Sequence, residues 1–387
     1  MFDIDMRNEF VGLTAQWVDR TVIPVAQELE AHNTYPETLI KEMKEMGIFG
    51  MLVPEQYGGL DVDLGTYWRV VSELSRGWMT LGGVINSHTI TAFLINRCGT
   101  DEQKEKYLPR MATGELRAAL AMTEAEAGSD VAAIRTVAKP RDGGYLINGS
   151  KMFITSGERA GLVCLLARTD TSTDKPHRGM SMILVERGEG LHAGRKIEKL
   201  GYNGIETVPL TFEDMFVPAD AILGGVENQG FYHAMTGGEI GRLNVGARAH
   251  GVARAAIDEA TKYALERKTF GVTISEHQAI QMLMAEMVTK THAAAGLLDQ
   301  AAEALSSGGR ADMEAGMAKY YATEVAVEAS LTSMRIHGGY GYTKEFIVER
   351  LFRDAPQMVI AEGTNEIQKM IISKAHFARA AAGGGHR

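Results

Sequence analysis

The chain has 387 residues, of which 45% are hydrophobic and 23% charged, and its formal net charge is -9 at pH 7. This length and composition are typical of a globular protein of two or three domains and exclude a largely disordered chain. The acidic balance argues against nucleic acid as a main partner. No apolar stretch approaches the length of a bilayer span and the N-terminus lacks a signal-peptide pattern, so we expect no membrane span and a cytoplasmic location.

Residue 6 to about residue 120 carries a helical pattern. Phe10, Leu13 and Trp17 recur at the spacing of one helix face, and the same period returns after Pro36. The pattern predicts an N-terminal helical domain over residues 1–120.

The sequence pattern changes from helical to short extended segments between about residues 121 and 225. Their apolar residues alternate with period two, and turn sequences such as Asp-Gly-Gly at 142–144 separate them. This pattern favours a middle β domain, built as a small antiparallel sandwich or barrel.

Long helical stripes return in the last part of the chain, residues 226–387. Ile280, Leu283, Met284 and Met287 mark one of them, and Ser-Ser-Gly-Gly at 306–309 is the expected turn between two helices. Three or four long helices with short connections pack as a bundle. We therefore expect a mainly α chain with a central β domain.

The cysteines and histidines do not have the spacing typical of a disulfide framework or a metal site. Cys98 and Cys164 lie far apart and outside any Cys-x-x-Cys, which predicts reduced core thiols. The histidines lack the spacings of metal sites, so we expect no metal.

One carboxylate stands out as a candidate catalytic base. Glu362 precedes Gly363, and Asn365 and Gln368 have the spacing of a helix N-cap and its capping-box partner. A carboxylate on such a turn, with apolar neighbours, suits proton abstraction in a partly dry site. The alternative is that the glutamate only complements the helix dipole.

Two further stretches could line a polar ligand. Residues 122–131 place Thr123 and Ser129 on a flexible loop, although a plain surface turn explains the composition equally well. Phe153 and Thr155 share one face of a predicted strand, which suits stacking and hydrogen bonding to a planar ring but also fits any half-buried strand.

Two stretches in the helical part are compatible with a phosphorylated ligand. Arg267 follows a helix and could hold a pyrophosphate, or it could complement the helix dipole. Gly338 and Gly339 allow a ligand to approach the backbone, but a helix-ending turn needs no ligand.

In this order the motifs closely resemble the acyl-CoA dehydrogenase family, over about residues 5–380. The segments that carry the resemblance are MTEAEAGSD at 122–130, LGYNGIETVPLTFEDMFVPADAILG at 200–224, DEATKYALERKTFG at 258–271, RIHGGYGYTKEF at 335–346 and AEGTNEIQ at 361–368. The resemblance implies an N-terminal helical domain, a middle β domain and a C-terminal four-helix bundle, with FAD held between the last two and across a subunit boundary of a homotetramer.

The resemblance also assigns roles to individual residues. Glu362 would be the base, and the substrate would be held by Ser129, Arg242 and Gly363. The FAD contacts near the flavin ring would come from Met122, Thr123, Ser129, Phe153 and Thr155. Those to the rest of FAD, partly in a neighbouring subunit, would come from Arg267, Phe270, Gln278, Arg335, Gly338, Gly339, Thr364 and Glu366.

The reaction implied is the α,β-dehydrogenation of an acyl-CoA thioester to the trans-2-enoyl-CoA. Glu362 would remove the α proton and flavin N5 would accept the β hydride, with an electron-transfer flavoprotein as the electron acceptor. Some members carry the base on the bundle helix instead, at the position of Gly241, which has no side chain to offer. The rival readings are an oxidase or flavin monooxygenase on the same fold and a non-catalytic flavoprotein scaffold.

Overall fold

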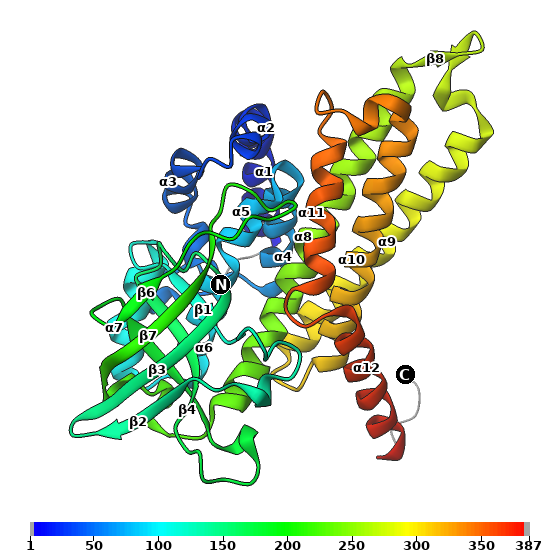
Figure 1. The fold of residues 1–387 in the computed structure, drawn as a ribbon. Helices are drawn as coiled ribbons and strands as arrows, with labels where there is room; N and C mark the ends of the chain where they lie inside the picture. The colour runs from blue at the N-terminus through cyan, green and yellow to red at the C-terminus, as the bar shows by residue number, and fades with distance from the viewer. Residues whose placement is uncertain (1–3, 383–387) are drawn as a thin grey trace.

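The computed structural model describes residues 4–382 as an N-terminal group of helices, a curled β sheet and a bundle of long helices (Figure 1). The chain passes through these parts in that order. This is the mainly helical architecture with a central β domain that the sequence predicts.

The N-terminal helices form because their apolar faces bury against one another and their ends are capped. Asp63 caps one helix by accepting from Thr66 N at 3.1 Å, and Thr100 and Gln103 form a capping box at another. Trp17 packs against the core, but Leu13 is 51% exposed, so the expected shared face is incomplete. The helices are α1 Ile4–Trp17, α2 Ile23–Ala31, α3 Glu37–Glu45, α4 Leu64–Gly77, α5 Met79–Val84, α6 Asn86–Cys98 and α7 Asp101–Ala112.

Within the described residues, seven strands form one curled sheet in the order β1-β4-β2-β3-β7-β6, with β5 on β4. Most pairings are antiparallel as expected, but β1 and β2 each pair with β4 in parallel. The sheet starts a few residues before position 121, because the short run at 118–121 joins it. The strands are β1 Ala118–Ala121, β2 Val137–Arg141, β3 Gly144–Thr155, β4 Leu162–Arg168, β5 Met180–Glu186, β6 Leu191–Ala193 and β7 Thr207–Pro218.

Strand β4 joins the sheet to the helical core. Cys164 belongs to the large core shared with the helices, whereas its neighbours Val163 and Leu165 belong to a separate core inside the sheet. Both faces of β4 are therefore buried, which explains why its sequence is continuously apolar.

The C-terminal bundle consists of long helices that run side by side (Figure 1). The turn predicted at 306–309 lies between two of them. A two-stranded hairpin, β8 Lys268–Thr269 with β9 Val272–Thr273, projects beyond the bundle. The helices are α8 Gly230–Glu266, α9 Gln278–Ser306, α10 Asp312–His337, α11 Val348–Ile360 and α12 Asn365–Ala381.

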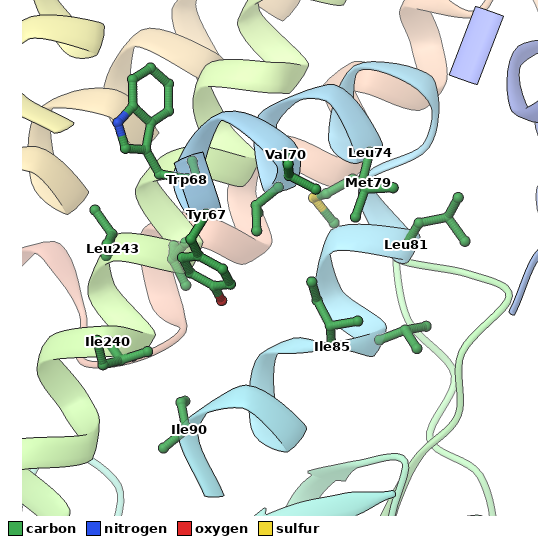
Figure 2. Packing of buried hydrophobic residues seen from close by; sticks show 14 of the residues in the cluster. Tyr67, Trp68, Val70, Leu74, Met79, Leu81, Ile85, Ile90, Ile240 and Leu243 are labelled. Carbon is green, nitrogen blue, oxygen red and sulfur yellow. The ribbon is translucent and has the colours of Figure 1, made fainter. Parts of the chain in front are cut away.

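The N-terminal helices pack directly onto α8. Tyr67 of α4, Ile85 and Ile90 around α6, and Ile240 and Leu243 of α8 lie in one continuous buried cluster (Figure 2). This junction places α6 beside the turn between α11 and α12, where Glu362 lies. No helix among residues 4–382 is long and apolar enough to span a membrane.

Candidate functional site

Glu362 lies in the short turn that joins α11 to α12. Its φ is 55° and that of Gly363 is 82°, so two successive residues adopt the left-handed conformation. For a residue with a side chain this conformation is costly and is typically held by its surroundings. The backbone here aims the Glu362 side chain back toward α8 and α6.

Lys319 of α10 holds this turn from inside. Its Nζ donates to Val359 O at 3.0 Å, to Gly363 O at 2.9 Å and to Asn365 Oδ1 at 2.8 Å. Burial lowers the pKa of Lys319, to about 7, while the charge of Glu362 acts to raise it. Because three acceptors match the three hydrogens of an ammonium, we assign the charged form.

The start of α12 differs by one residue from the prediction. Thr364, not Asn365, is the N-cap, and its side chain accepts from Ile367 N at 3.4 Å. The Asn365 amide instead turns inward to Lys319 and Thr323. Gln368 is not a capping-box partner either, because its Nε2 donates to Gly363 O at 3.0 Å.

The Glu362 carboxylate faces two other elements. Asn86 at the start of α6 donates through Nδ2 to Oε1 at 2.9 Å. On α8, a Cβ built at Gly241 would lie 2.7 Å from Oε2. The glycine thus leaves the space that the carboxylate occupies, as expected if Glu362, not position 241, supplies the acid.

Several polar residues near this carboxylate were not singled out from the sequence. Asn244 Nδ2 donates to the Tyr67 hydroxyl at 2.9 Å, and both side chains are buried beside Arg248 of α8. The signal that could have revealed them is the presence of Asn and Arg on an otherwise apolar, Ala- and Gly-rich helix. A polar residue on such a face needs a partner from elsewhere in the fold.

The sheet contributes an exposed aromatic ring from β3. A register shift between Lys151 and Ile154 marks a β-bulge, and Phe153 within it has φ 61° and is 60% exposed. A bulge re-aims a side chain, and here it turns a large ring out of the sheet. Thr155 follows on the same strand and is only half-buried.

Lys151 fixes the loop that carries Met122, Thr123 and Ser129. Its Nζ donates to Met122 O and pairs with Glu124, both at 2.9 Å. Thr123 O accepts from Met152 N at 2.8 Å, which ties the loop to the strand next to Phe153. The two predicted stretches are thus neighbours, with Ser129 exposed beyond them.

A cavity of about 500 Å³ lies at the C-terminal end of α10, the end away from Lys319. Arg267, Gly338 and Gly339 line it together with Thr269 and Tyr340. A Cβ on either glycine would meet no atom within 4 Å, so the backbone is open to a ligand. The structure brings these predicted cofactor residues together at the C-terminal end of α10, whereas Phe153 lies on strand β3 of the sheet.

Three other predicted cofactor residues do not line this cavity, although Phe270 directly follows Thr269, which does. Arg335 lines a smaller hollow, of about 140 Å³, between α9 and α10. Phe270 is at the tip of the projecting hairpin and is 97% exposed, and Gln278 begins α9 on the surface.

The remaining predicted residues lie near the base. Thr364 and exposed Glu366 occupy the start of α12. Arg242, next to Gly241, is buried and lies 3.3 Å from Asp312 through Nη1, while its Nε has no partner. Among residues 4–382 no group of side chains has the arrangement of a metal site.

Comparison with known proteins extends over the whole of this architecture. Models of the acyl-CoA dehydrogenase N-terminal, middle and C-terminal domains match residues 5–115, 119–215 and 228–377. The chain is 41% identical to an acyl-CoA dehydrogenase of Bacillus subtilis, over 92% of this chain and 93% of that protein. It is 38% identical to the caffeyl-CoA reductase-Etf complex subunit CarC of Acetobacterium woodii, over 90% of this chain and 92% of that one.

A solved structure gives the same result. Butyryl-CoA dehydrogenase from Megasphaera elsdenii matches with a TM-score of 0.94 and 33% identity, and covers 97% of this chain and 99% of its own. The likeness therefore includes the helical, β and bundle parts and the turn that carries Glu362. The chain belongs to the acyl-CoA dehydrogenase family.

Proposed function

We propose that the protein catalyses FAD-dependent α,β-dehydrogenation of an acyl-CoA thioester to the trans-2-enoyl-CoA, with Glu362 as the base. The observation that carries the proposal is the placement of the Glu362 carboxylate. It is held on a strained turn against Asn86 and against a glycine that leaves it room. A carboxylate fixed in this way is positioned to remove one proton from one carbon.

The same turn offers a donor to the substrate. Among residues 4–382 no acceptor takes a hydrogen bond from the Glu362 N–H, while the Glu362 carbonyl accepts from Gln368 and the Gly363 carbonyl accepts from Lys319. This free N–H can bind the thioester oxygen, where negative charge develops as the α proton leaves. Substrate binding and proton removal then depend on one rigid turn.

The residues of this chain fit FAD in two places. The exposed Phe153 ring offers a stacking surface beside Thr155, and Met122, Thr123 and Ser129 lie on the adjoining loop. The cavity lined by Arg267, Gly338 and Gly339 offers a cation and open backbone to a pyrophosphate. Bound FAD supplies the acceptor for the hydride that leaves the β carbon.

We also propose that the protein acts as a homotetramer. A fully exposed phenylalanine on a projecting hairpin is costly in water and is typical of a contact surface. Phe270 and Gln278 would then complete the FAD site of a neighbouring subunit, together with Arg335. The Etf complex of the A. woodii relative supports an electron-transfer flavoprotein as the redox partner. A cytoplasmic location is part of this proposal.

The test is reconstitution with FAD followed by product analysis. The purified protein is expected to bind FAD and, with an acyl-CoA and an electron-transfer flavoprotein, to form the trans-2-enoyl-CoA. Stoichiometric peroxide formation in air without that partner would favour the oxidase reading instead. A protein that takes up no FAD would contradict the proposal altogether.

A further inference from the structure

Arg248 of α8 is a buried cation without a counter-ion. Its side chain is 1% exposed, and Nε and Nη1 have no hydrogen-bond partner. Among residues 4–382 no carboxylate lies within 4 Å of its guanidinium. A buried charge is normally paired, because taking it out of water without a partner is strongly unfavourable. The missing partner is therefore expected to come from a ligand.

Arg248 lies on the same face of α8 as the position opposite the base. Gly241, Asn244 and Arg248 are spaced three and four apart, which places them on one side of the helix. Seven residues correspond to roughly 10 Å along the axis, and helical side chains lean toward the N-terminal end. The guanidinium thus extends from further down α8 back toward Glu362.

The charges of Arg248 and Glu362 both act on the pKa values of two buried tyrosines. Burial raises the pKa of Tyr67, to about 12, while the charge of Arg248 acts to lower it and that of Glu362 to raise it. Burial also raises the pKa of Tyr202, on which the same two charges act in the same opposite directions. The Tyr202 ring lies 5.6 Å from the Arg248 guanidinium carbon. Arg248 and Glu362 therefore belong to one buried region.

Several other buried polar atoms in this region also lack a hydrogen-bond partner, which is unusual in a protein core. Ser75 Oγ, Asn86 Oδ1 and Asn244 Oδ1 are buried without a partner, as are Nε and Nη1 of Arg248. A Cβ at Gly82 would lie 2.3 Å from Ser75 Oγ and 2.9 Å from Arg248 Cγ, so a side chain there would displace the arginine. Figure 2 shows the frame of this region, with Tyr67 of α4 directed between α8 and the α5–α6 segment.

We propose that Arg248 binds a carboxylate at the far end of the acyl group, so that the substrates are acyl-CoA thioesters of dicarboxylic acids. This rests on the proposed function, because the thioester end of the substrate must lie beside Glu362. The acyl chain then continues inward along α8, where Arg248 is the buried cation. A planar guanidinium matches a carboxylate with two parallel hydrogen bonds.

A substrate with a neutral acyl terminus would leave the guanidinium buried and unpaired, so its binding is disfavoured. A carboxylate both neutralises the charge and supplies acceptors for Nε or Nη1. Discrimination therefore falls on the acyl terminus, while the chemistry at the α and β carbons is unchanged.

The test compares charged and neutral acyl groups on the FAD-loaded enzyme. Glutaryl-CoA and adipyl-CoA are the charged probes, and pentanoyl-CoA and hexanoyl-CoA are the neutral counterparts. The variants are Arg248→Met and Arg248→Lys, with Arg254→Met as the control, because Arg254 lies on the same helix but pairs with Glu73. FAD content and thermal unfolding establish that each variant is folded and loaded.

We expect the parent to prefer the charged probes. Arg248→Met should lower kcat/KM for them by roughly 100-fold or more, change it little for the neutral probes, and keep its FAD. Arg248→Lys should recover part of the loss, and Arg254→Met should behave as the parent.

Two results would overturn the inference alone: a parent that prefers the neutral probes, or an Arg248→Met variant that loses both classes equally or loses FAD. If the FAD-loaded parent turned over neither class, the proposed function itself would fail.

Discussion

Gly241 of α8 faces Glu362 so closely that a Cβ at position 241 would lie 2.7 Å from Oε2 of the carboxylate. The resemblance places the base of some family members at position 241, so that position and the Glu362 carboxylate are two approaches to one point in space. In this chain the turn carries the carboxylate, and Gly241 of α8 leaves the space that the carboxylate occupies. Any side chain at 241 would compete with the carboxylate that it faces.

This relationship predicts that the base can be moved. Glu362→Gly should lower turnover by roughly 100- to 10,000-fold, and the double variant Gly241→Glu with Glu362→Gly should recover part of it. Gly241→Ala alone should lower activity, because its methyl group collides with the carboxylate. Steady-state turnover of the FAD-loaded variants measures all three. A double variant no better than Glu362→Gly would show that the two positions do not share a site.

Asn86 is predicted to position the base. Its amide donates to Oε1 at 2.9 Å, and a hydrogen bond to a charged group contributes about 1.5–3 kcal/mol. Asn86→Leu should therefore reduce kcat by roughly 10- to 100-fold while FAD content is unchanged. Asn96→Leu on the more exposed side of the same helix is the control. Equal kcat in the parent and Asn86→Leu would refute the role.

Lys319→Met tests how the turn is held. The variant loses three hydrogen bonds to the turn and to Asn365, worth roughly 3 kcal/mol in the free energy of unfolding. Turnover should fall as well, because Glu362 loses its support. Lys290→Met removes a half-exposed ion pair with Glu328 and should cost less than about 1 kcal/mol. Similar losses of stability in denaturant unfolding of both variants would contradict this account.

Phe270→Ser tests the contribution of the hairpin to a neighbouring subunit. We expect lower FAD content and a smaller assembly in light scattering, since the proposed interface then loses the aromatic ring that it buries. Phe377→Ser, at a 69% exposed position on α12, is the matched control and should change neither property. A Phe270→Ser variant with full FAD and unchanged mass would exclude the hairpin from the interface.

His250 predicts a dependence of stability on pH. Burial, with a smaller effect of Arg254, lowers its pKa from 6.5 to about 3, so in the intermediate range the unfolded chain binds a proton that the folded chain does not. The free energy of unfolding should therefore fall as pH drops from 6.5 toward 3, by up to about 1.4 kcal/mol per pH unit from this residue. In His250→Asn that contribution should vanish, but in exposed His192→Asn it should persist. An unchanged pH slope in His250→Asn would be the contrary result.

The order of domains and the turn with Glu362 could be predicted because they depend on local patterns. Periodicity separates the helical segments from the strands, and Glu362 lies in a motif with a glycine and a following helix. The N-cap was misplaced because Asn365 has a tertiary partner, Lys319, which is 46 residues away in the sequence. Local capping preference gives way to a buried hydrogen-bond network of this kind.

The second half of the site could not be predicted for the same reason. Asn86 meets Glu362 across 276 residues, and no local pattern reports such a contact. Arg248 looks like one more helix former until the fold shows it to be buried. The bulge at Phe153 likewise depends on the register between β3 and β7. Chemistry that depends on packing between domains becomes visible only in three dimensions.

The most direct test of the central claim is rapid-mixing measurement of flavin reduction under anaerobic conditions, with the parent and Glu362→Gln compared at equal FAD content. The account predicts that acyl-CoA bleaches the flavin of the parent and that the variant binds the same substrate but bleaches at least roughly 100-fold more slowly. Bleaching of Glu362→Gln at the rate of the parent would contradict the assignment of Glu362 as the base.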